Sequence, residues 1–455
     1  MKVRLSTAAA SVWTARGKQL TLLLAAAAVL HVSVAAVVFT VGKLGLMPSQ
    51  FNEKGLGTFA SDGLVYQTEA VELCNVLKTQ GIAAWATWPT QLHVRIYSLP
   101  LIALYRWAGF NILTIEPLNL IYYLAILTLV FKLGTTAFDY RAGLLAATIV
   151  ALWPSFILHT TQLLRDPLLI SAFLILILSL VQCLKRDYTW WAGLLWGLLS
   201  AIAILTVRIV RLPMWDLLWA TIGLAVLMLV VQSVRQRRFP VGNVCFAIVM
   251  IAAMLITPHF QTALGNQQYV KLRRVILPVE IQDMPVEGQI VKRREGFGLQ
   301  VDPTGETVPS SAGSDIDKGV RFNSFADIIR YVPRAVVVGF FAPFPSIWLT
   351  AGKQVGTSGR LLSGFETMLT YLIEGLALFG LWSGRKLLTT WFLCFAATSG
   401  AVVLGLIVNN MGALYRLRYP FWVLLVVLGG GGASYLVRRR DRRSVTERGA
   451  LPVTS

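Results

Sequence analysis

Two aspartates stand at the polar borders of long apolar segments, where a carboxylate could act on a proton or a cation. Asp62 begins a stretch whose apolar residues recur at helical spacing, and Asp166 lies between an arginine and a proline directly before another apolar segment. Either aspartate could simply cap a helix, because aspartate is favoured at that position. A carboxylate at a low-dielectric boundary could also accept a proton from a hydroxyl, and two carboxylates could hold a divalent cation.

Arginine is the second residue type with a chemical use in this pattern. Its guanidinium group matches two phosphate oxygens at once, so arginines on the same side as the acids suggest a phosphate-binding site. Arginines at the ends of apolar segments can instead extend their charge into interfacial water, which requires no ligand. The candidate phosphate contacts are Arg208, Arg211, Arg334, Arg416 and Arg418.

The other ionisable residues form no recognisable metal or nucleotide motif. His93, His159 and His259 are not spaced as a metal pair and are each interpreted as structural. The 4 cysteines lie far apart, so neither a zinc site nor a disulfide framework is indicated. The sequence contains no P-loop, no dinucleotide-binding fingerprint and no convincing nucleophile elbow, so nothing in it supports an activity driven by ATP or NAD.

The composition places these residues in a membrane protein. Of the 455 residues, 56% are hydrophobic and 14% are charged, whereas soluble proteins average about 25% charged residues. The net charge of +19 is spread over the ends of the apolar segments and does not form one basic patch. Nucleic-acid binding is therefore not expected, and membrane lipids are the expected surroundings.

The apolar segments predict an all-α polytopic membrane protein with about ten transmembrane helices and external juxtamembrane helices. The first segment is longer than the core of a signal peptide and is expected to be retained. Two further apolar runs, residues 94–110 and 332–348, are ambiguous, and prolines in the second argue against one continuous helix. The expected transmembrane segments are Leu20–Val41, Pro117–Phe138, Ala142–His159, Leu168–Leu184, Trp190–Val207, Pro213–Gln232, Val241–Pro258, Thr367–Trp382, Leu387–Val408 and Tyr419–Val437.

The positive-inside rule orients these segments. If the two ambiguous runs are juxtamembrane or re-entrant, every short cationic loop and both termini fall in the cytoplasm. The acids and the candidate arginines then lie on the external face. The expected parts are an N-terminal transmembrane module of residues 1–260 with a first external loop at 42–117, an external loop region at 261–330, a C-terminal transmembrane module at 331–437 and a basic cytoplasmic tail at 438–455.

This layout resembles the GT-C superfamily of polytopic membrane glycosyltransferases, in the bacterial branch akin to protein O-mannosyltransferases and lipid A aminoarabinose transferases. The resemblance rests on the acid in SDGLVYQTEAVEL, the proline-bearing run YSLPLIALYRWAGF, the Trp153-Pro154-Ser155 sequence and Asp166. It covers roughly the first 210 residues, and beyond them only the layout and the arginine-rich turn before the last span match. Asp62 is followed by glycine, whereas several such families have an adjacent Asp-Glu pair, which weakens a metal site built on neighbouring carboxylates.

The resemblance implies transfer of a sugar from a polyprenyl-phosphate-linked donor to an envelope or exopolysaccharide acceptor. It implies a bacterial inner (plasma) membrane enzyme with its active site on the external, periplasmic face. Asp62 would be the general base and Asp166 the second external acid. No family motif identifies the arginines, so their role in holding the donor phosphate rests on their chemistry and their expected external position alone. Tyr66 and His93 are candidate contacts for the acceptor or the sugar. The expected partners are the lipid-linked donor, a glycan or lipid acceptor and membrane lipids; no cofactor is required, although the acids could hold a divalent cation.

Three other functions remain open at this point. An O-antigen-type polymerase or ligase acting on a pyrophosphate-linked glycan would depend on the arginines more than on the acids. A flippase or transporter for lipid-linked oligosaccharides would place ionisable residues inside its spans, where Lys132 and Glu374 are the main examples here. A non-catalytic scaffold of an envelope assembly complex would tolerate replacement of the acids.

Overall fold

The chain folds into an all-α polytopic membrane protein, as the sequence predicts. The computed structural model describes residues 2–60, 62–237, 240–260, 284–297, 299–301, 307–309, 315–317, 319–350, 352 and 355–449. Within these ranges, 9 helices are long and apolar enough to cross a membrane, and one bent helix pair makes up to 10. All the expected transmembrane segments coincide with these helices.

The spanning candidates are distributed along the whole chain. In order they are α1 (Lys2–Lys43), α4 (Ile112–Ala137), the bent pair α5 (Tyr140–Ala151) and α6 (Pro154–Thr160), α7 (Asp166–Lys185), α8 (Trp190–Val210), α9 (Trp215–Gln236), α10 (Val241–Phe260), α15 (Gly356–Ser383), α16 (Leu388–Ile407) and α18 (Tyr419–Gly449). The other described α-helices and strands are α2 (Asp62–Thr87), α3 (Leu92–Ala108), α13 (Val286–Phe297), β1 (Leu299–Val301), β2 (Thr307–Pro309), α14 (Phe325–Phe341) and α17 (Met411–Leu417).

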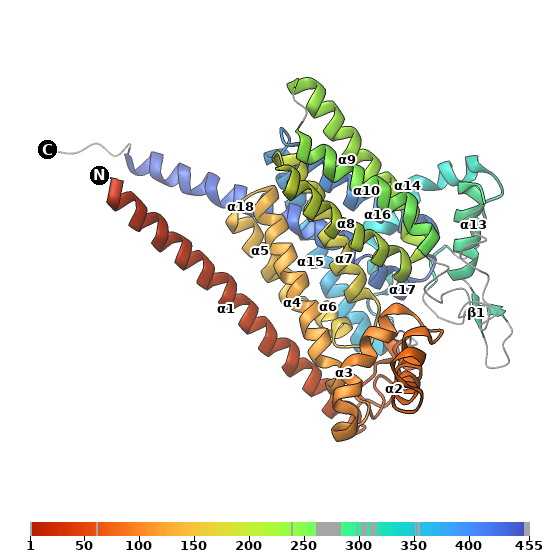
Figure 1. Cartoon of the computed structure of the whole chain (residues 1–455). Coiled ribbons are helices and arrows are strands. Elements are labelled where there is room, and N and C mark those ends of the chain that lie inside the picture. Colours follow the sequence, from red (N-terminus) through yellow and green to blue (C-terminus); the bar gives the residue numbers. More distant parts are fainter. Residues whose placement is uncertain are drawn as a thin grey trace.

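Helix α7 forms the centre of the bundle (Figure 1). It is apolar around its whole circumference, and 89% of the residues in its most apolar stretch are buried, against 22% for α1. A helix that is apolar on all sides is expected in the middle of such a bundle. Helices α4, α8, α16 and α18 all contact α7, while α1 runs along the edge. Because α7 begins at Asp166, the central helix carries one of the candidate acids at its end.

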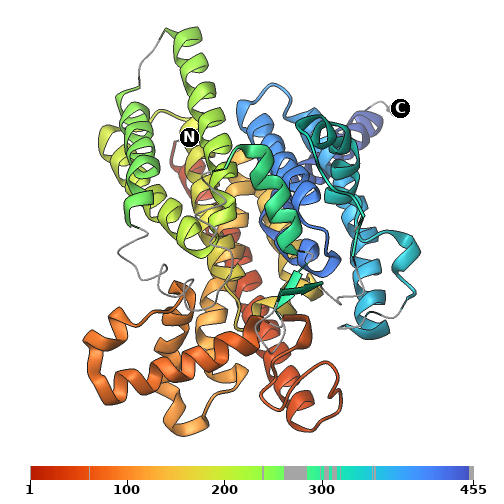
Figure 2. The ribbon, with the colours of Figure 1, turned by 90° about the vertical axis from the view of Figure 1, so that its right-hand side faces the viewer.

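The two ends of the bundle carry different groups of ion-paired residues. At one end, Arg438 pairs with Asp139 at 2.8 Å and Arg141 pairs with Asp441 at 3.4 Å, which ties the start of α5 to the last turns of α18. We call this the tail end. The opposite end carries Asp62 and Asp166, and we call it the acid end. Helices α2 and α3 form a layer across the acid end, away from both chain termini (Figures 1 and 2).

Neither ambiguous run forms a continuous spanning helix. Residues 94–110 form most of α3, which packs against α2 and α4. Residues 332–348 include the second half of α14, which lies antiparallel to α16, with Gly339 against Ala401 and Gly405 against Ala335. Glycine at these contacts lets the two backbones approach closely. Beyond α14 the chain turns back along α15, because the Tyr371 hydroxyl donates to Phe341 O at 2.7 Å and Trp348 lies against Gly364, nearer the start of α15.

The expected loop region at 261–330 is described only in part. Residues 261–283 and several shorter stretches lie outside the described residues, as does the side chain of His259. The described portion contains α13 and the antiparallel pair β1–β2, in which Leu299 is opposite Pro309. Arg294 fixes α13 to the bundle by donating to Leu406 O at 2.9 Å, next to the end of α16.

The turn after α14 is held by Arg418, one of the candidate phosphate contacts. Its Nη1 donates to Phe340 O at 3.0 Å and to Ala342 O at 2.7 Å, and Trp348 Nε1 donates to Pro343 O at 2.8 Å. Carbonyls at the end of a buried helix lack partners within the helix, and apolar surroundings offer no water to replace them. Arg418 therefore completes the hydrogen bonding of the half-length helix α14.

We expect Arg418→Met to lower the free energy of unfolding by about 1–3 kcal/mol, because it leaves buried carbonyls without donors. Thermal unfolding of the purified protein in detergent measures the change. Arg385→Met is the control: Arg385 Nη1 donates to Trp382 O at 2.9 Å, but at an exposed position. The control should stay within about 0.5 kcal/mol of the unchanged protein. Equal losses in the two variants would contradict this role for Arg418.

Candidate functional site

Residues from distant parts of the chain meet at the acid end. Asp62 begins α2, Asp166 begins α7, Arg211 follows α8 and Arg416 lies in α17. Arg165 adjoins Asp166 and is close enough to influence the charge of Asp62. We call these five residues the acid–arginine cluster. Both predicted catalytic acids and two of the predicted phosphate-binding arginines belong to it.

Arg416 is shared by the two acids. Its Nη2 lies 2.6 Å from Asp62 Oδ2, and its Nε lies 3.1 Å from Asp166 Oδ2. Arg211 Nη1 lies 3.2 Å from the other oxygen of Asp166. The Asp166 side chain is 7% exposed and that of Asp62 is 37% exposed. Asp62 is therefore the acid that a molecule arriving from outside the bundle can reach.

Close packing brings the two acids together. A Cβ atom at Gly63 would lie 3.2 Å from Leu163 O, so the start of α2 approaches the turn before α7 more closely than most side chains allow. This contact gives a physical reason for the glycine that follows Asp62. The Asp166 carboxylate is directed at Arg211 and Arg416, so its role in the fold is ion pairing.

The charge of Asp62 follows from its neighbours. Burial raises the pKa of its carboxyl, but Arg416 and Arg165 outweigh burial and hold the pKa below its ordinary value of 3.8. A depressed folded-state pKa stabilises the fold above pH about 4, and this contribution is lost as the pH falls through the lowered value. Asp62 is thus ionised at neutral pH, but it is a weak base while Arg416 is paired with it.

Several buried polar atoms in and beside the cluster have unmet hydrogen-bonding capacity. His93 Nε2, Arg165 Nε, Asp166 Oδ2 and Arg416 Nε are buried, and no described residue gives them a hydrogen bond. The last two atoms form the 3.1 Å ion pair, but that contact is not aligned as a hydrogen bond. Because buried polar groups are normally paired, these donors and acceptors are what a polar ligand could use.

Tyr66 and His93 lie together next to the acids. Their rings pack edge to face with centroids 4.4 Å apart, and both side chains are buried. Burial lowers the pKa of His93 well below its ordinary value of 6.5, and the nearby Arg165 lowers it further. His93 is therefore a neutral imidazole at physiological pH.

Three of the predicted arginines lie elsewhere. The Arg208 guanidinium lies 4.2 Å from the centroid of the Trp215 ring. Arg334 forms a bidentate pair with Asp317, at 2.8 and 3.1 Å, on the surface of α14. Arg418 bonds the carbonyls at the end of α14. Arg165 belongs to the cluster, although the sequence analysis did not select it. Its position directly before Asp166 is the one feature of the sequence that could have indicated this role.

A second polar network, which the sequence did not indicate, supports α17. Glu366 in α15 is fully buried and accepts hydrogen bonds from the backbone N–H of Ser155 at 2.7 Å, from Ser155 Oγ at 2.5 Å and from the Tyr415 hydroxyl. The Tyr419 hydroxyl also donates to Ser155 Oγ, at 2.8 Å. Since Tyr415 directly precedes Arg416, this network fixes the short helix that presents the shared guanidinium.

No group of three or more His, Cys, Asp or Glu side chains in the described ranges could hold a metal ion. Both cluster acids face guanidinium groups, which are not metal ligands. Comparison of the chain with protein-family models gave no match, and none of the curated proteins searched matches it. A function therefore has to be argued from the site.

We expect Arg416→Met to lower the free energy of unfolding by about 3 kcal/mol, because the buried Asp166 and the partly exposed Asp62 lose the cation that they share. Unfolding of the purified protein in detergent measures the loss. Arg334→Met provides the control, since it breaks a pair whose side chains are 44% and 22% exposed, and we expect a loss of less than about 1 kcal/mol. Similar losses in both variants would show that the cluster is no more important electrostatically than a surface pair.

Proposed function

We propose that the chain is a membrane glycosyltransferase that moves a sugar from a polyprenyl-phosphate-linked donor to an acceptor hydroxyl, with the acid–arginine cluster as its active site. The observation that carries this proposal is the direct ion pairing of Asp62 and Asp166 through Arg416. Residues that the sequence marks as candidates for acid–base and phosphate chemistry therefore lie in one site, although they come from segments far apart in the sequence.

The charge balance of the cluster favours an anionic donor. The guanidinium groups of Arg165, Arg211 and Arg416 face only two carboxylates, so the cluster has a positive charge in excess. Arg165 Nε and Arg416 Nε still have hydrogen-bonding capacity. Guanidinium donors in a dry site bind phosphate oxygens strongly and stabilise charge that develops on a leaving phosphate.

The reaction that fits these residues is a single displacement. The acceptor oxygen forms a bond to the anomeric carbon of the sugar while the bond from that carbon to the phosphate oxygen breaks, and the electron pair stays on the phosphate. Asp62 takes the acceptor proton, consistent with its ionised state and its partial exposure. Asp166 orients Arg211 and Arg416 toward the phosphate. Attack from the side opposite the phosphate inverts the anomeric carbon.

The location is part of the proposal. The cluster lies where α7 begins and α8 ends, which is at the boundary of the spanning segments. A polyprenyl tail could then lie among the helices while its phosphate reaches the arginines. The cationic loops and the basic tail occupy the opposite end, which the positive-inside rule assigns to the cytoplasm. We accordingly place the cluster on the external face of a bacterial inner membrane.

A transporter is the second candidate, because one observation favours it. His31 and Glu116 form a buried pair at 2.7 Å inside the spanning helices, and intramembrane ionisable residues often mark transport pathways. Transport would therefore depend on Glu116 more than on Asp62. An O-antigen-type polymerase or ligase would instead keep its activity without the acids and lose it without the arginines.

We expect Asp62→Asn to reduce sugar transfer by about 100-fold or more, because it removes the group that takes the proton. Asp166→Asn should also reduce transfer strongly, because it leaves Arg211 and Arg416 without their shared acid. The assay is restoration of the surface glycan in a strain lacking the gene, at matched membrane levels, followed by transfer from a panel of polyprenyl-phosphate sugars in vesicles.

Asp216→Asn is the control for this experiment. Asp216 is also an acid at the acid end, but it is 51% exposed and pairs with Arg293 outside the cluster, so its loss should leave transfer unchanged. Full activity in both cluster variants would exclude the proposed mechanism. Loss of activity only in Arg211 and Arg416 variants would favour the polymerase or ligase, and loss only in Glu116→Gln would favour the transporter.

A further inference from the structure

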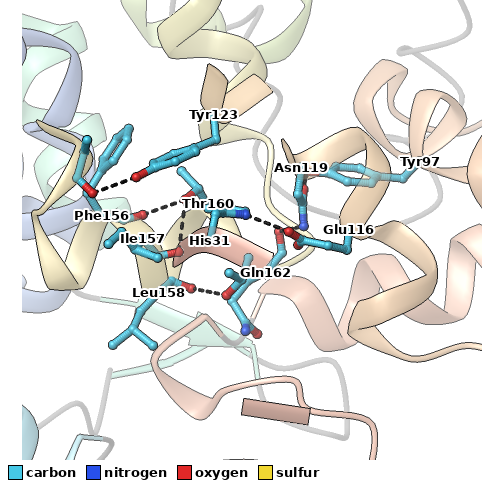
Figure 3. Close-up of polar contacts among 12 residues, drawn as sticks. His31, Tyr97, Glu116, Asn119, Tyr123, Phe156, Ile157, Leu158, Thr160 and Gln162 are labelled. Atoms are coloured by element: carbon cyan, nitrogen blue, oxygen red, sulfur yellow. Dashed lines mark hydrogen bonds and ion pairs between the residues drawn. The ribbon is translucent and has the colours of Figure 1, made fainter. Parts of the chain in front are cut away.

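The turn that delivers Asp166 is held by buried polar side chains. Residues 161–165 join α6 to α7, and Arg165 directly precedes Asp166. Whatever fixes this turn also fixes the position of the second acid relative to the first. The side chains around the turn come from α1, α3 and α4, so helices from the first third of the chain converge on it (Figure 3).

Gln162 connects this turn to the segment that leads to Asp62. Its side chain is fully buried. Gln162 Oε1 accepts a hydrogen bond from the backbone N–H of Gly57 at 2.9 Å, and Gln162 Nε2 donates to Gly55 O at 3.3 Å. One amide group therefore bonds to the chain a few residues before Asp62 while its own backbone lies a few residues before Asp166.

The turn itself is anchored without the Gln162 side chain. Asn119 Nδ2 donates to the backbone oxygen of Gln162 at 3.4 Å, and the Tyr97 hydroxyl donates to Asn119 Oδ1 at 2.7 Å; these three residues lie together in Figure 3. The Tyr97 hydroxyl also lies 3.2 Å from Leu164 O. His31 contacts Thr160 Oγ1 at 3.0 Å through Nε2. The backbone of the turn is therefore fixed by α1, α3 and α4, and the Gln162 side chain holds residues 55–57 against this turn.

We infer that Gln162 is a positioning residue for the acid–arginine cluster. It holds the start of α2 against the turn before α7, so that Asp62 and Asp166 both reach the guanidinium of Arg416. The effect on catalysis rests on the proposed function. The role of Gln162 in holding residues 55–57 against the turn before α7 does not. A displacement of about 1 Å in a reacting group can cost about 100-fold in rate, so a restraint of this kind can matter far beyond its own hydrogen bonds.

The test replaces Gln162 with methionine, which has nearly the same size but forms neither hydrogen bond. Hydrogen–deuterium exchange of the full-length protein in detergent is the first measurement. We expect faster exchange in peptides covering residues 52–66, because the Gly57 amide loses its acceptor. Gln162→Glu keeps an acceptor oxygen for that amide and is expected to exchange at an intermediate rate.

Asn243→Leu is the matched control. Asn243 is also a buried amide that joins two loops: its Oδ1 accepts from the Tyr188 N–H at 2.8 Å and its Nδ2 donates to Cys183 O at 3.1 Å. These contacts lie at the tail end. The control should lower thermal stability but leave exchange in residues 52–66 unchanged. Unchanged exchange in Gln162→Met, or the same change in Asn243→Leu, would overturn the inference.

Turnover separates positioning from a purely structural role. In the transfer assay, Gln162→Met should lower kcat per folded molecule about 10- to 100-fold and change KM much less. Combined with Asp62→Asn, it should cause little further loss, because both changes act on the same proton transfer. Normal kcat in an active protein would overturn the inference and leave the proposed function intact. If the unchanged protein transfers no sugar, the proposed function fails, and the exchange measurement alone decides the role of Gln162.

Discussion

The guanidinium of Arg416, shared by Asp62 and Asp166, is the contact on which the rest of the site depends. Two carboxylates brought together in a low-dielectric site cannot both stay ionised without a cation between them. The acids come from the N-terminal helices and the cation comes from α17, which is held in place by the hydrogen bond from its Tyr415 hydroxyl to Glu366. Neither expected transmembrane module contains the site alone, so its assembly requires the two modules to pack together.

The fold was largely predictable because bilayer thickness and chain hydrophobicity constrain it locally. Each span needs only its own apolar residues, so a segment such as α7 is recognisable without knowledge of its neighbours. The structure adds bends that hydrophobicity does not predict. The expected span Ala142–His159 is divided into α5 and α6 at an angle of 67°, with Pro154 beginning α6. Proline at the start of a helix ends the preceding one, but its effect on direction depends on packing.

The site was predictable by residue type but not by partner. Asp62, Asp166, Arg211 and Arg416 could be selected because they lie at span ends on one side of the membrane. The same criterion also selected Arg418 and Arg334, whose partners are the end of α14 and Asp317. Nothing local distinguishes these arginines, because each partner is fixed by the tertiary fold. The roles of the buried residues Glu366, Gln162 and His31 were not predictable for the same reason: the sequence around a single polar residue does not indicate which group it will bond.

The arrangement also suggests how binding and chemistry would be coupled in the proposed reaction. A donor phosphate entering the cluster competes with the acids for Arg416. Asp62 is the more exposed of the two acids, so it is the partner that Arg416 can release at lower cost. Burial still raises the pKa of Asp62, whereas Arg416, which lowers that pKa most, would then be directed at the phosphate. Seating the donor would therefore make Asp62 a stronger base at the moment when a proton has to be removed, and would keep it a weak base before then.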